Sequence, residues 1–241
     1  MLQWHRKTTR LYLLLSAAGA LLFTLLFHFV IVGEEATLSA NLNRLLGIRN
    51  FYVLPLLLMF CAATSIAEEK QSGWTKEALS QPISRPSYLQ SKLLIAAFLS
   101  VLSLGSTALP AMIFFPPEAG DIGQSLSAYG LCVLSDVLLI EITFLVSTFA
   151  RSAGAAALYT FFAFIAEGLA RLLFNLSRLL FSEDHILVDL GPQITQWMPG
   201  SIIGCWAVWK DDWTWYQPVA LIAFVLLLRV LLHQRMSRIQ L

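Results

Sequence analysis

Asp136 and Glu141 are carboxylates in the middle of a long apolar run, where they could move protons, bind a cation or pair with a base. Because an ionisable group inside a membrane is costly, each acid is a functional candidate. Their spacing of five residues turns them about 140° apart around a helix, so they do not form a paired carboxylate site. Arg229, in the last apolar run, is the candidate partner of Glu141. The sequence leaves open whether the acids serve structural pairing or proton and cation handling.

A second set of polar side chains follows the fifth apolar run at intervals of three or four residues. These intervals place the set on one face of a continuous helix, with Glu167 four residues ahead of Arg171, the favourable order for an intrahelical ion pair. Charge here must face protein, water or headgroups, because exposure to lipid tails costs at least about 2.5 kcal/mol per group. The face is either a helix end that reaches the outer surface or a polar wall of a substrate pathway. Its members are Glu167, Arg171, Asn175, Arg178 and Ser182.

Motifs for nucleotide, metal or hydrolytic chemistry are missing from the sequence. It has no GxxxxGK(S/T), HExxH or GxSxG motif, so we expect no nucleotide site and no hydrolase of these types. Cys61, Cys132 and Cys205 are isolated, which favours small buried side chains over metal ligands. Glu68 and Glu69 match the start of the EExxxR motif of membrane-embedded prenyl-type proteases, but Gly73 occupies the arginine position. The sequence therefore argues against an enzyme.

Apolar residues dominate the whole chain of 241 residues, of which 57% are hydrophobic and 13% charged, with a mean hydropathy of +0.70. Soluble domains are about one quarter charged, so this composition indicates an integral membrane protein. A spanning helix needs about 20 apolar residues, and six runs approach that length. We predict an all-α membrane protein with one domain, 1–241, whose six transmembrane helices are 11–32, 51–67, 93–115, 126–150, 153–173 and 216–232.

The distribution of charge predicts the orientation of these spans. The first run follows the basic stretch HRKTTR and is too long for the apolar core of a signal peptide, so we interpret it as an uncleaved span. Cytosolic loops of membrane proteins carry an excess of lysine and arginine. With the N-terminus in the cytoplasm, the outer side holds only five of the 16 such residues, namely Arg44, Arg49, Arg171, Arg178 and Lys210. We therefore expect both termini in the cytosol.

The region from 174 to 215, between the fifth and sixth spans, is rich in tryptophan. Indole side chains concentrate at the headgroup level of a bilayer, and Pro192 and Pro199 interrupt any long helix here. We predict a re-entrant or interfacial outer region, with a site that stacks carbohydrate or nucleotide as the alternative. The region holds five of the seven tryptophans: Trp197, Trp206, Trp209, Trp213 and Trp215.

The stretch SIAEEKQSGWTKEALSQPISRPSYLQSKLL, residues 65–94, is the only long polar interval in the first half of the chain. We expect the second span to continue through Glu69 and to stop near Gly73, because glycine accommodates a left-handed helix terminus. A short helix follows over 75–79. This helix is expected to lie across the cytosolic face and to present Trp74, which suits a docking surface better than a bare connection.

The second half of this stretch predicts the return of the chain into the membrane. Pro82 and Pro86 prevent the short helix from continuing and bend the connection. Ser87 and Gln90 have the spacing of a capping box, which predicts that the third span opens at Ser87.

These residues resemble the segment between the second and third spans of ABC-2 type permeases, the membrane subunits of ABC transporters. Members share two acids, a glycine, a short helix rich in leucine, the sequence P-I-S-R and a lysine that opens the next span. Trp74 departs from the pattern, because a small or hydroxyl residue is usual there. The matching residues are Glu68, Glu69, Gly73, Glu77, Leu79, Pro82, Ile83, Ser84, Arg85 and Lys92.

The resemblance implies a permease subunit whose short cytosolic helix is a coupling helix that docks on a separate ATPase. It implies two ATPase copies, a second permease that is identical or homologous, and ATP and Mg bound by the ATPases, with no cofactor on this chain. The expected location is the cytoplasmic (inner) membrane of a prokaryote, in contact with the lipid bilayer and with no nucleic acid. The expected docking residues are Glu68, Glu69, Gly73, Trp74, Thr75, Glu77, Leu79, Pro82 and Arg85, and the candidate pathway residues are Asp136, Glu141, Glu167, Arg171, Asn175 and Arg178.

Export of a hydrophobic or amphipathic substrate is the function that this reading favours. One alternative is an ABC-type complex that assists assembly or maturation of an envelope protein. Another is a secondary carrier that relays protons through Asp136, Glu141 and Glu167. Such carriers contain broken helices, for which the chain offers only weak hints at Gly105, Pro110, Gly154 and Gly168.

Overall fold

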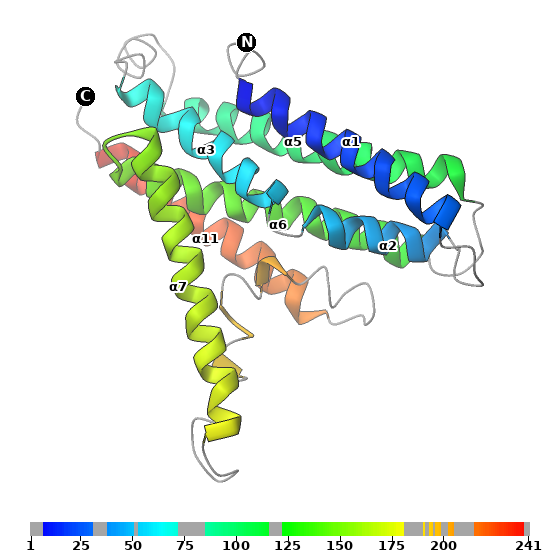
Figure 1. Cartoon of the computed structure of the whole chain (residues 1–241). Helices are drawn as coiled ribbons and strands as arrows, with labels where there is room; N and C mark the ends of the chain where they lie inside the picture. Colours follow the sequence, from blue (N-terminus) through cyan, green and yellow to red (C-terminus); the bar gives the residue numbers. More distant parts are fainter. Residues whose placement is uncertain are drawn as a thin grey trace.

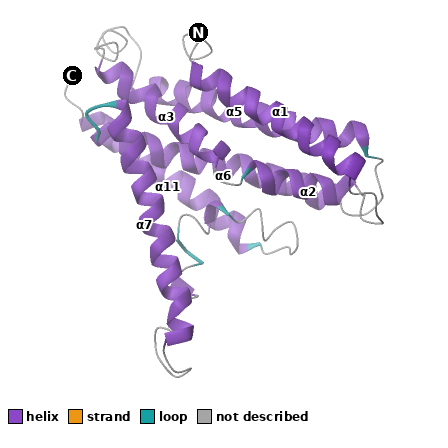
Figure 2. Cartoon of the chain, in the orientation of Figure 1, coloured by secondary structure: helices purple, strands orange, loops and turns teal. Residues whose placement is uncertain are grey.

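The computed structural model describes residues 7–30, 38–50, 53–71, 85–115, 122–180, 190, 193–194, 196–198, 202–204 and 215–238. Within these ranges the regular structure is helical, as Figure 2 shows, so the expected all-α class is confirmed. The long helices, labelled in Figure 1, are α1 (Lys7–Val30), α2 (Leu38–Arg49), α3 (Val53–Gln71), α5 (Arg85–Phe114), α6 (Ile122–Phe149), α7 (Ala153–Leu180) and α11 (Tyr216–Arg238).

Each of the six predicted spans overlaps one long helix, with ends that differ by up to eight residues. Four of the described helices are long and apolar enough to cross a membrane. α7 has a shorter apolar stretch and α3 ends in the charged turn Glu68-Glu69-Lys70, so crossing by these two helices stays a prediction. The four stretches are Thr9–Leu26, Ser87–Phe114, Ile122–Phe149 and Tyr216–Arg235.

α2 has no counterpart among the predicted helices. It has only 12 residues and several polar side chains, so it lacks the long apolar run by which the spans were found. Its buried leucines recur with helical spacing and pack against α1, α5 and α6. In Figure 1, α2 follows one half of α6. The buried leucines are Leu38, Leu42, Leu45 and Leu46, and Asn41 and Arg49 are buried with them.

α6 is the central helix, in contact with α2, α3, α5, α7 and α11. It is apolar around most of its circumference, as expected for a helix enclosed by others. Several of its hydroxyl groups are buried and donate to the carbonyl one turn earlier on the same helix. Ser135 donates to Leu131, and Thr143 donates to Leu139. These bonds satisfy polar groups within α6 where water is excluded.

The start of α1, the end of α3, the start of α5 and the end of α11 meet at one end of the bundle (Figure 1). Tyr12, Ile66, Leu89 and Leu232, one from each of these helices, belong to a single buried cluster. We call this the proximal end. That the two termini and the polar stretch 65–94 lie on one side of the membrane stays a prediction.

α7 leaves the other helices at a steep angle (Figure 1). It packs on α3 and α6 through an alanine contact that consists of Ala63, Ala67, Ala150, Ala156 and Ala157, where the small side chains allow the backbones to approach closely. Beyond this contact the helix presents large apolar side chains at its surface, which suits contact with lipid or with another chain. These exposed residues are Leu158, Tyr159, Phe161, Phe162, Ile165, Leu169, Leu172 and Leu173.

The start of α5 differs from the predicted capping box. The helix begins at Arg85, so the prediction that it opens at Ser87 is wrong. Pro86 falls in the first turn of α5. Proline is tolerated there because backbone N–H groups in the first turn have no intrahelical acceptor. α5 also continues through Gly105 and Pro110. α7 is likewise continuous from Ala153 through Gly154 and Gly168 to Leu180, so the hinted breaks are not present in either helix.

Candidate functional site

Glu69 joins the end of α3 to the start of α5. Tyr88 Oη donates a hydrogen bond to Glu69 Oε2 over 2.5 Å, and Lys92 Nζ donates to Glu69 Oε1. The Lys92 ammonium also lies 5.5 Å from the centre of the Tyr88 ring. The side chains of Lys92 and Glu69 are only 9% and 13% exposed, so the two opposite charges compensate each other where solvent reaches them poorly. We call Glu69, Tyr88 and Lys92 the Glu69 clamp.

The Glu69 clamp stands at the base of the predicted docking segment. α3 ends at Gln71 and α5 begins at Arg85, so the clamp holds the two helix ends from which residues 72–84 depart. Lys92 was matched to the family pattern as an opening lysine, and the structure gives it a partner, Glu69. The predicted coupling helix, with Gly73, Trp74, Thr75, Glu77, Leu79 and Pro82, lies outside the described residues, as do the side chains of Glu68 and Arg85.

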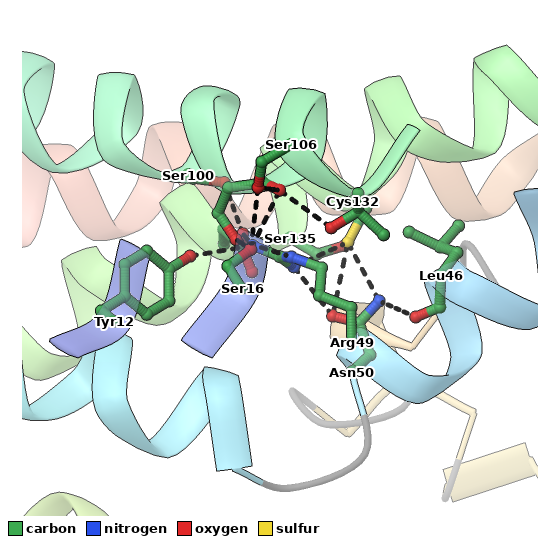
Figure 3. A network of polar contacts seen from close by, with 12 residues as sticks. Tyr12, Ser16, Leu46, Arg49, Asn50, Ser100, Ser106, Cys132 and Ser135 are labelled. Carbon is green, nitrogen blue, oxygen red and sulfur yellow. Dashed lines mark hydrogen bonds and ion pairs between the residues drawn. The ribbon is translucent and has the colours of Figure 1, made fainter. Parts of the chain in front are cut away.

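A second polar cluster surrounds Arg49, the last residue of α2, and is drawn in Figure 3. The guanidinium is buried, and its Nη2 lies 2.6 Å from Asp136 Oδ2 in α6. Ser100 of α5 donates a further hydrogen bond to the same carboxylate oxygen. Asp136 is therefore a member of a buried ion pair in the middle of the bundle.

The other donors of Arg49 also have acceptors. Nη2 donates to Tyr12 Oη over 3.0 Å, Nε to Ser103 Oγ over 3.3 Å, and Nη1 to Asn50 Oδ1 over 2.9 Å. The Cys132 sulfur lies 3.4 Å from Nη1. The Arg49 guanidinium thus connects α1, α2, α5 and α6. Its five N–H donors are surrounded by acceptors from these helices. Cys132 is buried, as predicted.

Ser16 continues this cluster along the contact between α1 and α5. Its Oγ lies 2.7 Å from Ser103 Oγ and 3.2 Å from Ser106 Oγ, and it donates to the carbonyl of Ser103 over 3.1 Å. Figure 3 shows Ser16 and Ser106 close to the other polar side chains. Small hydroxyl residues let the two helices approach and bond to each other without a bulky side chain between them.

The placement of Arg49 corrects its assignment as an outer cation. Arg49 is 3% exposed and ion-paired inside the bundle. The sequence contains a signal that was missed, because Leu38, Leu42, Leu45 and Arg49 recur at helical spacing and place the arginine on the apolar face of α2. A charge on an apolar face requires a buried opposite charge.

Glu141 pairs with Arg229, as predicted from their positions. Nε and Nη2 of Arg229 both lie 3.0 Å from Glu141 Oε1. The Glu141 side chain is 1% exposed, whereas the Arg229 side chain is 50% exposed. The two acids of α6 have different partners on different helices, which agrees with the expectation that they do not form one carboxylate site. Glu141 lies close to the proximal end, beside Leu89 and His233.

The polar face predicted on the fifth span lies on one continuous helix. α7 runs unbroken from Ala153 to Leu180, so the spacing of its polar residues keeps them on one side of the backbone. Their side-chain surroundings lie outside the described part of the chain, as does Ser182. The residues concerned are Glu167, Arg171, Asn175 and Arg178.

The described part of the Trp-rich region lies against the start of α11. The Trp197 and Trp215 rings are 6.3 and 6.5 Å from the Tyr216 ring, and both tryptophans are exposed. Ile202 is buried with Leu138 and Leu221, so this region packs on α6 and α11. Trp206, Trp209, Trp213 and Cys205 lie outside the described residues, and a re-entrant or interfacial arrangement stays a prediction.

Several helices that can cross a membrane, with charges paired among them, define a multi-pass integral membrane protein. A family model described as ABC-2 family transporter protein matches residues 1–167, from the N-terminus into α7. The chain belongs to this family, which confirms the resemblance found in the sequence. The family forms the transmembrane part of transporters and is not itself catalytic. No curated protein matches the chain.

Proposed function

We propose that this chain is the transmembrane subunit of an ATP-driven transporter that exports a hydrophobic or amphipathic substrate. Membership of the ABC-2 family supports the transporter class. The observation that carries the proposal is the Glu69 clamp, which brackets residues 72–84 at the proximal end. A simple connection between two helices does not require a poorly exposed ion pair and a hydrogen bond at its base, such as those that Glu69 makes with Lys92 and Tyr88.

A separate ATPase supplies the energy in this proposal. Two copies bind ATP and Mg and dock on the segment that contains Gly73, Trp74 and Thr75. Because Glu69 ties α3 to α5, a displacement of the segment moves both helix ends together. α3 and α5 contact α6, and α3 also contacts α7, so the displacement reaches the helices that carry the polar residues. The Glu69 clamp thereby serves as the mechanical base of coupling.

A second permease subunit, identical or homologous, completes the proposed transporter. α7 projects from the bundle and exposes a long apolar surface that includes Phe162 and Leu173. One part of this surface of α7 can contact lipid, and another part can contact the partner subunit. The transporter is proposed to reside in the cytoplasmic membrane of a prokaryote, with the proximal end in the cytosol.

Purification of the tagged full-length chain from its own membranes in mild detergent tests the proposal. We expect it to bring down a chain with a GxxxxGK(S/T) motif and ATP hydrolysis that vanadate inhibits. Glu69→Gln is expected to lower the bound ATPase severalfold, because Lys92 and Tyr88 lose their charged acceptor and the base of the segment loosens. Trp74→Ala is expected to do the same without touching the Glu69 clamp.

Arg151→Gln is the matched control, since it removes an exposed charge from the connection between α6 and α7. It should leave the ATPase bound, and circular dichroism should show unchanged helicity in all three variants. Absence of an ATPase from the wild-type preparation contradicts the transporter proposal. Full retention of the ATPase by both Glu69→Gln and Trp74→Ala contradicts the assignment of the docking segment.

A further inference from the structure

A cavity of about 420 Å³ lies between α5, α6 and α11 at the proximal end. Its volume falls in the range of about 300–1,000 Å³ that is usual for sites that bind small molecules. Leu89, Leu93, Val230 and Leu232 form apolar walls, and Glu141 contributes a carboxylate. The cavity therefore combines an apolar lining with a single buried acid.

Glu141 has one carboxylate oxygen without a hydrogen-bond donor among the residues that the structure describes. Oε1 accepts a hydrogen bond from Arg229 Nε and lies 3.0 Å from Arg229 Nη2, whereas Oε2 is buried and has no partner there. Buried carboxylate oxygens without donors are rare because desolvation is not compensated. Oε2 is itself out of reach of solvent, so the carboxylate must rotate toward the cavity that Glu141 lines before a bound molecule with an N–H or O–H group can supply the missing donor.

Arg229 adds a positive group at the mouth of the same cavity. Its side chain is 50% exposed, and its contacts with Glu141 involve only Nε and Nη2, whereas a guanidinium has five N–H donors. The planar fork of arginine suits phosphate oxygens in particular. Glu141, which lacks one donor, therefore lies beside Arg229, which has further N–H groups to donate. A zwitterionic headgroup with an amine and a phosphate matches this pair, because its amine can donate to the acid and its phosphate can accept from the arginine.

The mouth of the cavity lies where polar and apolar surface meet. Val230 lines the cavity and is 53% exposed, and Leu94, 61% exposed, lies one helical turn after the lining residue Gln90 on the same face of α5. Gln90 and His233 are exposed lining residues that offer polar atoms beside them. This combination suits an amphiphile whose head enters the cavity and whose tail lies along α5 and α11.

We propose that this cavity binds an aminophospholipid, with a primary ammonium that donates to the Glu141 carboxylate and a phosphate that accepts from Arg229. The lipid tail occupies the apolar surface next to Leu94 and Val230. The site does not depend on ATP or on a partner subunit, so it goes beyond the proposed transport function. It gives the chain a preference for one class of membrane lipid.

Native mass spectrometry of the purified full-length chain in detergent tests this site. The chain is mixed with equal amounts of phosphatidylethanolamine and phosphatidylcholine that carry the same acyl chains. The choline head is charged but has no N–H, so it cannot donate to Glu141. We expect the ethanolamine lipid to bind about tenfold more tightly, as for one hydrogen bond to a charged group. Equal binding overturns the proposal, and so does equal binding of phosphatidylglycerol, which lacks the amine.

Two variants locate the preference. Glu141→Gln is expected to remove the preference for the ethanolamine lipid. Val230→Trp, at an exposed position over the cavity, is expected to block binding while Glu141 and Arg229 keep their bonds. Val219→Trp is the matched control on the same helix, 56% exposed and outside the cavity lining, and it should bind as the wild type does. Wild-type selectivity in either Glu141→Gln or Val230→Trp contradicts the site.

Glycerophosphoethanolamine, which is the headgroup without acyl chains, separates a lipid from a soluble ligand. At the same concentration as the lipid it is expected to leave lipid binding unchanged, because the apolar walls contribute nothing to its affinity. Complete displacement of the lipid by this headgroup would assign the cavity to a soluble amino phosphate and overturn the lipid assignment.

Discussion

Asp136→Asn is expected to lower the free energy of unfolding by about 3–5 kcal/mol, the loss typical when one partner of a buried ion pair is removed. The substitution leaves Arg49 buried at 3% exposure without an opposite charge. Tyr12, Asn50 and Ser103 still accept hydrogen bonds from the guanidinium, but none of them is charged. Titration of purified protein from mild detergent into sodium dodecyl sulfate, followed by circular dichroism, measures the change.

Glu141→Gln is the control for this prediction, because it removes an acid from the same helix. Its partner Arg229 is half exposed and can be solvated, so the expected loss is about 1 kcal/mol or less. The double variant Arg49→Met and Asp136→Leu removes both charges and is expected to be less destabilised than Asp136→Asn. An Asp136→Asn protein as stable as the wild type would exclude the buried pair.

Ala156→Leu is expected to destabilise the protein by about 1–3 kcal/mol through overpacking of the alanine contact. Ala156 and Ala63 are both fully buried, so no space is left for a larger side chain between α3 and α7. The added atoms must push α7 away from α3, which also separates it from Ala150, the residue that follows α6. The same detergent titration measures the loss of stability.

Ala163→Leu provides the matched comparison for Ala156→Leu. It makes the same chemical change seven residues later on α7, at an exposed position, and is expected to alter the free energy of unfolding by no more than about 0.5 kcal/mol. Equal effects of the two substitutions would mean that α7 does not pack closely on α3.

Hydropathy predicts the long helices well because each long apolar run must be helical in a membrane to satisfy its backbone. It also allowed the prediction of Glu141 and Arg229 as partners, since depth along two spans can be estimated from position in the sequence. The predicted start of α5, Ser87, is two residues later than the observed start, Arg85. The sequence does not distinguish the two, because proline occurs in the first turn of a helix as well as before it.

The Arg49 cluster could not be predicted in the same way. α2 is too short and too polar for a hydropathy signal, and a count of loop charges treats its arginine as an exposed cation. The partner, Asp136, is brought close only by the packing of α2 against α6. Ser100 and Tyr12 join from two more helices, and no spacing in the sequence relates them. The sequence feature that does indicate a buried Arg49 is its position on one helical face with Leu38, Leu42 and Leu45.

The ion pair of Arg49 also sets an order of events during biosynthesis. Asp136 follows Arg49 by 87 residues, which at about 5–20 residues per second takes about 4–17 seconds to synthesise. Until then an unpaired guanidinium would cost at least about 2.5 kcal/mol in the lipid interior. We therefore expect α2 to remain at the membrane surface after α1 has inserted, and to pack among the helices only after α6 has been synthesised.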